Sequence, residues 1–334
     1  MAIPVGVLGA GSFGTCLALL CAREHDVRLW ARDPELADAI NRERRNPSYL
    51  KHCAVPERVR ATADLAEALE GRELVICAIP SHGLRGVMER AAPLVPEGAL
   101  LVSTVKGIEL DTWMRMDQVL ADVLDPVHHP RLTFLSGPSF AAEIAIQKPT
   151  AVTVACRQES YAISVQESLS CPWFRCYSAT DVVGVEIGGA LKNVVAIAVG
   201  ICDGLELGHN ARAGVMTRGL REITRLGVAM GADPLTFLGL AGMGDLVLTC
   251  TGDLSRNRQV GLALARGERL AEIVRRTQEV AEGVRTTTAA CALAEIHGVE
   301  MPIAHAVARV LDGELEPKEA VERLLSRQLR NENE

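Results

Sequence analysis

The sequence predicts an α/β protein, in which a doubly wound, mostly parallel sheet is followed by an all-α domain. Three observations support this fold class. Apolar runs alternate with helical segments in the first half of the chain, a glycine-rich motif follows the first apolar run, and convincing strand patterns end near residue 180. We therefore expect two domains, residues 1–180 and residues 181–334.

The predicted strands are short apolar runs bounded by glycine, proline or polar residues. They cover residues 3–8, 27–30, 74–79, 99–105, 132–135 and 151–156. Helical patterns fall between several of them, for example at 15–23, 62–69 and 84–92. Such alternation is typical of parallel strands that are covered by helices on both faces.

The second half of the chain has helical spacing throughout. Residues 182–231 form a long helical stretch, and further helices are expected at 262–276, 286–296, 303–311 and 318–327. Fourteen of the 29 glycines lie between Gly184 and Gly252. Because glycine destabilises a helix relative to alanine, we expect these glycines to serve close packing or to expose backbone to a ligand.

Composition excludes several classes of protein. The chain has 334 residues, 48% of them hydrophobic, and a net charge of −7, which is not the composition of a disordered protein. Its acidity and its 3% aromatic content argue against binding of nucleic acid. No apolar run reaches the roughly 20 residues that span a bilayer, so no membrane insertion is expected.

The ten cysteines contain no Cys-x-x-Cys pair, and several lie inside apolar runs. This pattern predicts reduced core thiols in a cytoplasmic protein rather than a disulfide framework. No cysteine or histidine pairs occur at the spacing of metal ligands, so no metal is expected.

A Gly-x-Gly-x-x-Gly motif, formed by Gly9, Gly11 and Gly14, joins the first strand to the first helix. The three glycines allow a tight turn, close approach of a pyrophosphate, and close packing of helix on strand, while the helix N-terminus offers free N–H groups. The motif predicts a Rossmann-like domain that binds a dinucleotide. The alternative is a glycine turn with only a structural role.

The second strand ends at Arg32 and Asp33. At this position an acidic side chain favours NAD, whereas an arginine can hold the 2′-phosphate of NADP. The sequence leaves both open, and Arg32 favours acceptance of NADP. Either side chain could instead simply end the strand in solvent.

Two further segments follow predicted strands and so should lie at the carboxyl edge of the sheet. Lys106 would bring a cation there, and Gly137 and Ser139 could offer N–H and hydroxyl donors to an anion. The alternatives are a solvated loop lysine and ordinary turn residues.

Lys192 stands in a mostly apolar helical segment at 186–199. A buried lysine must find a partner or lower its pKa, and a lysine with a lowered pKa is suited to exchange a proton with a hydroxyl or carbonyl oxygen. A salt-bridged structural lysine is the alternative.

Ser255, Arg256 and Asn257 form a polar group after an apolar segment. A guanidinium with neighbouring hydroxyl and amide groups is a good phosphate receptor. Alone, the same residues are also typical of a helix start with Ser255 as its N-cap.

Taken together, these motifs resemble the bacterial NAD(P)-dependent glycerol-3-phosphate dehydrogenases. The resemblance covers nearly the whole chain. It rests on Gly-Gly-Ala-Leu-Lys-Asn at 188–193, Gly-His-Asn-Ala-Arg-Ala at 208–213, Thr-Arg-Gly at 217–219, and the segments 105–109, 136–143, 240–246 and 282–287, which are specific when taken together.

The resemblance implies reversible hydride transfer between NAD(P)H and C2 of dihydroxyacetone phosphate, which yields glycerol 3-phosphate for phospholipid synthesis. It implies that Lys192 is the proton acceptor and donor. The implied substrate residues are Lys106, Gly137, Ser139, Lys192, Asp245, Ser255, Arg256 and Asn257. The implied cofactor residues, besides the three motif glycines, are Ser12, Phe13, Arg32, Lys106, Ala141, Arg256, Val280 and Glu282.

Two positions depart from the family pattern: Phe13 stands where many relatives have tryptophan, and Glu206 lies in a loop that often has glycine. The alternatives are a β-hydroxyacid or 6-phosphogluconate type dehydrogenase and a non-catalytic NAD(P) sensor. In the former, the catalytic lysine and asparagine are separated along a helix, whereas Lys192 and Asn193 are adjacent. The expected partner is a small phosphorylated three-carbon substrate, and a homodimer is allowed.

Overall fold

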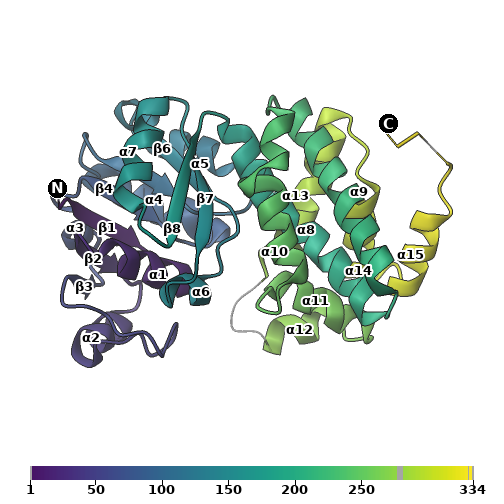
Figure 1. The fold of residues 1–334 in the computed structure, drawn as a ribbon, viewed down its shortest axis with the longest axis horizontal. Coiled ribbons are helices and arrows are strands. Elements are labelled where there is room, and N and C mark those ends of the chain that lie inside the picture. The colour runs from purple at the N-terminus through teal and green to yellow at the C-terminus, as the bar shows by residue number, and fades with distance from the viewer. Residues whose placement is uncertain (1, 277–280, 330, 333–334) are drawn as a thin grey trace.

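The computed structural model describes residues 2–276, 281–329 and 331–332. A sheet domain with the N-terminus and a helical domain with the C-terminus lie side by side along the longest axis of the molecule (Figure 1). The chain crosses from one to the other between the last strand, which ends at Ala179, and a long helix that begins at Val182.

The sheet has eight strands in the order β3-β2-β1-β4-β5-β6-β7-β8. All neighbouring strands are parallel except β6 and β7. The order reverses between β1 and β4, as in a Rossmann-like fold, so the predicted fold class is confirmed. The strands are β1 (Pro4–Leu8), β2 (Asp26–Trp30), β3 (Val59–Thr62), β4 (Leu74–Cys77), β5 (Leu100–Ser103), β6 (Leu132–Ser136), β7 (Thr150–Ala155) and β8 (Phe174–Ala179).

The sequence missed β3 and β8, which are the two edge strands of this sheet. In β8, buried Phe174 and Cys176 alternate with exposed Arg175 and Tyr177, so the strand lacks the continuous apolar run of a central strand. The predicted helix at 62–69 starts too early because Thr62 still belongs to β3.

The described part of this domain contains seven α-helices, which lie around the sheet (Figure 1). They are α1 (Ser12–Cys21), α2 (Pro34–Glu43), α3 (Leu65–Leu69), α4 (Ser81–Ala91), α5 (Met116–Val123), α6 (Ala141–Ala145) and α7 (Glu159–Leu169). The predicted helix at 15–23 begins earlier, at Ser12, because the glycine motif runs directly into the first helical turn.

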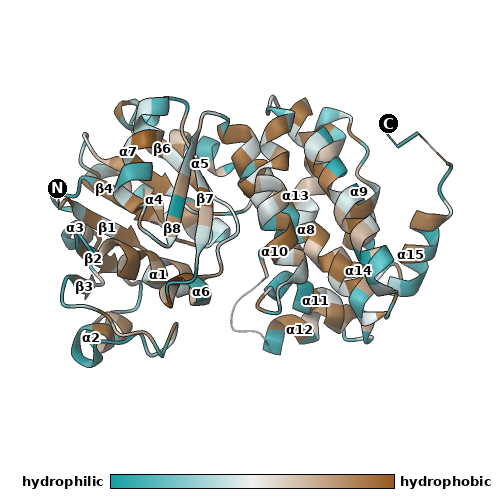
Figure 2. Cartoon of the chain, in the orientation of Figure 1, coloured by the Kyte–Doolittle hydropathy of each residue, from teal (hydrophilic) through white to brown (hydrophobic). Residues whose placement is uncertain are grey.

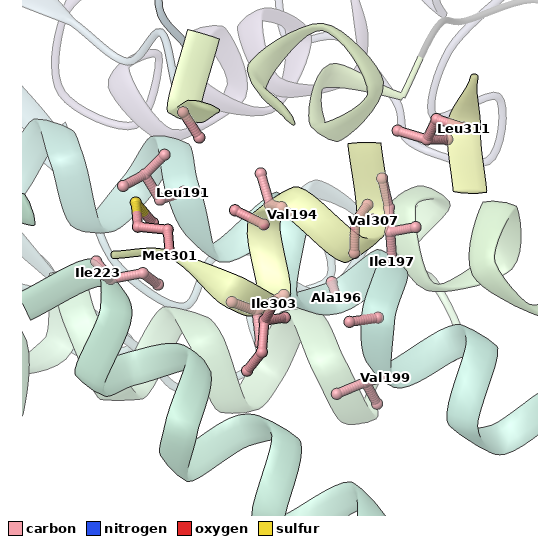
Figure 3. Close-up of a cluster of buried hydrophobic side chains, with 14 of the residues drawn as sticks. Leu191, Val194, Ala196, Ile197, Val199, Ile223, Met301, Ile303, Val307 and Leu311 are labelled. Atoms are coloured by element: carbon pink, nitrogen blue, oxygen red, sulfur yellow. The ribbon is translucent and has the colours of Figure 1, made fainter. Parts of the chain in front are cut away.

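The helical domain is built around α8 (Val182–Gly204). By length and composition this helix could cross a membrane, but 94% of its most apolar window is buried inside the protein, as in the core helix of a soluble protein. Figure 2 shows apolar residues along α8. Its side chains Leu191, Val194 and Ile197 belong to one buried cluster with Ile303 and Val307 from α14 (Pro302–Leu311), part of which is drawn in Figure 3.

The remaining helices pack against α8 or against one of its neighbours. They are α9 (Gly208–Ala229), α10 (Asp245–Thr251), α11 (Arg256–Ala265), α12 (Leu270–Arg276), α13 (Glu282–His297) and α15 (Pro317–Leu325), and a π-helical turn at Leu240–Gly244 leads into α10. The prediction of a single helix at 262–276 is wrong. This segment is two helices, α11 and α12, because the chain turns at Gly267 with φ +84.

Glycines on α8 and α11 allow these two helices to pack closely. A Cβ on Gly200 would overlap the carbonyl oxygen of Arg258 on α11, and a Cβ on Gly261 would overlap the carbonyl oxygen of Ile197 on α8. The expectation that glycines here serve packing is therefore confirmed at this crossing. Between α8 and α9, Glu206 adopts a φ of 55°, a conformation in which glycine is favoured.

Candidate active site

The glycine motif forms the turn between β1 and α1. Gly9 has φ +113, and a Cβ there would lie 2.5 Å from the carbonyl oxygen of Ala78. A Cβ on Gly14 would overlap the Gly9 carbonyl, whereas a Cβ on Gly11 would meet nothing within 4 Å. The turn is thus tightly packed at Gly9 and Gly14 and open at Gly11, where a pyrophosphate would approach the backbone.

The side chains of Arg32 and Asp33, which follow β2, differ in their surroundings. Asp33 is the N-cap of α2, and its Oδ1 accepts a hydrogen bond of 3.0 Å from the backbone N–H of Glu35. Arg32 is exposed beside it. Because a guanidinium attracts a phosphate and a carboxylate repels it, Arg32 is the one of the two that could hold a phosphate on the adenosine ribose.

Three charged side chains meet in the interior between the two domains. Lys192 on α8 forms an ion pair with Oδ1 of Asp245, the first residue of α10. Lys106, which follows β5, pairs with Oδ2 of the same carboxylate at 2.6 Å. Asp245 is 1% exposed, so one buried carboxylate separates two ammonium groups.

Burial and charge set the protonation of this centre. Burial lowers the pKa of Lys192 to about 8, with the Lys106 charge contributing and the Asp245 carboxylate opposing. Burial alone would raise the pKa of Asp245, but the two lysines outweigh it and hold that pKa below its usual value. Asp245 therefore stays ionised while Lys192 can gain or lose a proton near neutral pH.

The segment after β6 lies against Lys106. Gly137 has φ +137, and its carbonyl oxygen accepts hydrogen bonds from Lys106 Nζ at 3.0 Å and from the Ser139 hydroxyl at 2.8 Å. Nζ of Lys106 also lies 3.5 Å from Ser139 Oγ. Ala141 then opens α6, which packs on α1 beside the glycine turn.

The polar group at the start of α11 forms the helix start that the sequence offered as one interpretation, while its role as a phosphate receptor stays a prediction. Ser255 is buried and caps the helix, accepting a 3.3 Å hydrogen bond from the Arg258 N–H. Arg256 is exposed at the first helical position. Arg258 is held by Asp203 at 2.8 Å and Asp253 at 3.2 Å.

Asn257 ties three helices together. Its amide nitrogen donates to the side-chain oxygen of Asn193 on α8 at 2.9 Å, and its amide oxygen accepts from the backbone N–H of Gly283 on α13 at 2.9 Å. Asn193 is the neighbour of Lys192. The side chain of Asn257 thus connects the helix of the buried lysine to the start of α13.

Glu282, the first residue of α13, reaches across to the sheet domain. Its carboxylate accepts hydrogen bonds from the backbone N–H of Ser81 at 3.1 Å and from the Ser81 hydroxyl at 2.6 Å. Val280, the other cofactor position expected near here, lies outside the described residues, so its role stays a prediction.

Thr249 belongs to the site and was missed. Lys192 donates a 3.0 Å hydrogen bond to its hydroxyl, which in turn donates to the carbonyl oxygen of Asp245 at 2.6 Å. Thr249 follows Asp245 by one helical turn, and this spacing was the signal that could have found it. Ser81 was also missed, and nothing in its local sequence marks it as the partner of Glu282.

In the part of the chain that the structure describes, no group of three His, Cys, Asp or Glu side chains is placed to hold a metal ion. The arrangement instead offers a buried lysine for proton exchange, a cation at a helix start for an anion, and a glycine turn for a dinucleotide.

Comparison with known families agrees with this arrangement. Residues 4–162 match the family described as the N-terminus of NAD-dependent glycerol-3-phosphate dehydrogenase, and residues 181–322 match the C-terminus of the same family. The chain belongs to this family. The family resemblance predicted from the sequence is therefore confirmed.

Individual relatives are similar over their full length. The glycerol-3-phosphate dehydrogenase [NAD(P)+] of Myxococcus xanthus is 51% identical over 98% of each chain, and that of Geobacter sulfurreducens is 51% identical over 98% of each chain. The crystal structure of glycerol-3-phosphate dehydrogenase from Coxiella burnetii is 39% identical, with a TM-score of 0.92 over 98% of this chain and 99% of that one.

Proposed function

We propose that this member of the family reduces dihydroxyacetone phosphate to sn-glycerol 3-phosphate, and catalyses the reverse reaction, with NADPH or NADH. The observation that carries the proposal is the buried Lys192–Asp245–Lys106 centre beside a dinucleotide turn. A bound nicotinamide supplies the hydride that C2 of the ketone receives. The protein supplies the proton for the C2 oxygen and the charges that orient the substrate.

Lys192 is the group proposed to donate that proton. Lys192 is buried, and with a pKa of about 8 it is mostly protonated at neutral pH, as ketone reduction requires. After it has donated its proton, it can take up another from solvent. In the oxidative direction the neutral amine accepts the proton of the C2 hydroxyl. Asp245 stays ionised throughout and keeps Lys192 and Lys106 at fixed positions, with Thr249 as the third partner of Lys192.

The phosphate of the substrate is assigned to the start of α11. Arg256 brings an exposed guanidinium there, and the N-terminus of a ten-residue helix adds partial positive charge. Ser255 and Asn257 hold this turn in place by the capping and amide hydrogen bonds described above. Gly137 and Ser139 complete the proposed substrate residues beside Lys106.

The residues proposed to bind the dinucleotide surround the turn between β1 and α1. The turn at Gly9, Gly11 and Gly14 fits a pyrophosphate, because Gly9 and Gly14 allow the tight turn and the backbone at Gly11 is open to a ligand. The further proposed contacts are Ser12, Phe13, Arg32, Lys106, Ala141, Arg256 and Glu282. In this assignment residues 1–180 bind the cofactor and residues 181–334 bind the substrate and carry the proton donor.

The deciding experiment is the initial rate of NADPH oxidation, then of NADH oxidation, with dihydroxyacetone phosphate. Glyceraldehyde 3-phosphate, which places the carbonyl on C1, is the control substrate. Rapid and selective turnover of the ketone supports the proposal. Binding of NADPH without turnover of any ketone or aldehyde would refute it and favour the sensor alternative.

The cellular setting is proposed on the same basis. The described chain holds ten free cysteines, most of them buried. This suits a reducing cytoplasm, where the product would feed glycerophospholipid synthesis. A homodimer is a further expectation, which sedimentation equilibrium at micromolar concentration would test directly.

A further inference from the structure

One interdomain contact joins the cofactor side of the site to the helical domain. Ser81 opens α4 and Glu282 opens α13, 201 residues later in the chain, and two hydrogen bonds connect them. Ser81 is only 5% exposed. We propose that Ser81 is a positioning residue, which fixes the Glu282 carboxylate toward the dinucleotide and holds the two domains together beside it. This inference rests on the proposed function.

The position of Ser81 in the sheet domain supports this role. The backbone N–H of Ala78 donates a hydrogen bond to the carbonyl oxygen of Leu8. The carbonyl oxygen of Ala78 would lie only 2.5 Å from a Cβ on Gly9. The turn from β4 to α4 therefore packs directly on the dinucleotide turn. Ser81 follows Ala78 by three residues, at the point where the strand order reverses and such sheets bind ligands.

The contact leaves Glu282 able to bind a ligand as well. A carboxylate offers about four acceptor positions, and Ser81 uses two of them. The others can accept hydroxyl groups of a ribose while the contact with Ser81 persists. The N-terminus of the 11-residue helix α4 places partial positive charge beside the Glu282 carboxylate.

The same contact adjoins the reactive centre. A Cβ on Gly107 would lie 2.6 Å from the Cβ of Ser81 and 3.4 Å from Oε2 of Glu282, so the backbone at Gly107 packs against both side chains. The preceding residue is Lys106, which pairs with Asp245. On the other side, Gly283 is bound by Asn257. A change at Ser81 should therefore disturb the position of Glu282 directly and the position of the Lys106 segment indirectly.

The test is Ser81→Ala, with NADPH binding measured by its fluorescence and with steady-state kinetics on the full-length enzyme. Loss of a hydrogen bond to a charged group predicts that the Kd and KM of NADPH rise about tenfold, while kcat falls less than about threefold. Glu282→Gln should raise the same constants. Because both residues act through one contact, the double variant should bind NADPH no more weakly than Glu282→Gln alone.

Thr133→Val is the matched control. It removes a buried hydroxyl that donates to the Leu101 carbonyl inside the sheet, so it should lower the melting temperature without changing the Kd of NADPH. Unchanged or tighter NADPH binding by Ser81→Ala, or additive effects in the double variant, would overturn the inference. Failure of the proposed function is seen separately, as a wild-type enzyme that binds NADPH but does not turn over dihydroxyacetone phosphate.

Discussion

Lys192 and Asp245 form an ion pair inside the protein, one from the central helix and the other from the start of α10. Side-chain exposure is 8% for the lysine and 1% for the aspartate. Lys106 binds the second oxygen of the same carboxylate, so neither oxygen of Asp245 is left without a cationic partner. This arrangement allows a charged cluster in a low-dielectric interior, where an unpaired charge would be strongly destabilising.

Lys192→Ala should lower kcat by roughly 10²- to 10⁴-fold, because it removes the group proposed to transfer a proton in the transition state. The Kd of NADPH should stay within about threefold of the wild-type value. Stopped-flow turnover and fluorescence binding measure the two quantities. Turnover close to that of the wild type would show that another group supplies the proton.

The pH profile should depend on the direction of the reaction. Ketone reduction needs protonated Lys192, so kcat/KM should fall as the pH rises through about 8, and alcohol oxidation should rise over the same range. Asp245→Asn removes the charge that opposes the lowering of the Lys192 pKa. The inflection in the pH profile of this variant should therefore move to lower pH, by about one unit or more. A shift to higher pH would contradict this electrostatic account.

Arg256 and Arg258 should separate binding from stability. Arg256→Ala should raise the KM for dihydroxyacetone phosphate by about tenfold or more, because a charge-assisted phosphate contact is lost, with little change in melting temperature. Arg258→Ala should instead lower the free energy of unfolding by about 1–3 kcal/mol, because it breaks the ion pair with Asp203. Kinetics and thermal unfolding of both variants provide the comparison, and a destabilised Arg256→Ala with a normal KM would mark that arginine as structural.

Arg32 should determine the preference between cofactors. Arg32→Ala should raise the KM of NADPH by about tenfold and leave that of NADH nearly unchanged, because only NADPH has the 2′-phosphate. Asp33→Asn is the matched variant. It keeps an N-cap oxygen for α2, so it should leave both constants close to wild type. Equal effects of Arg32→Ala on the two cofactors would mean that Arg32 does not contact the 2′-phosphate.

Glu206→Gly should stabilise the protein. Glu206 is exposed and has a φ of 55°, which is strained for a residue with a side chain. The free energy gained by removing this strain should be larger than the cost of the extra conformational entropy that glycine has in the unfolded chain. The free energy of unfolding should rise by about 0.5–1 kcal/mol, measured by urea denaturation. A decrease would indicate that the Glu206 side chain contributes a stabilising interaction.

Local sequence patterns predicted most of the sheet and the chemical residues of the site. Six strands were found because apolar residues predominate in each, even where Arg28 interrupts β2, whereas β3 and β8 at the edges were missed because polar residues break the apolar pattern in both. Lys192 was found because a lysine in an apolar helix is expected to be buried, where it needs a charged partner or a lowered pKa. Asp245, by contrast, entered only through the family resemblance, since an acidic residue after glycines has no distinctive pattern.

The sequence by itself determined the fold class, the dinucleotide turn and the candidate proton donor, because each depends on residues that are close together in the chain. Only the tertiary structure decided the partners of those residues. It placed Asp245 between Lys192 and Lys106, directed Asn257 to Asn193 and Gly283, and brought Ser81 to Glu282. These contacts join segments that are separated in the chain, and their geometry follows from how the helices pack around α8 and how the helical domain packs on the sheet domain.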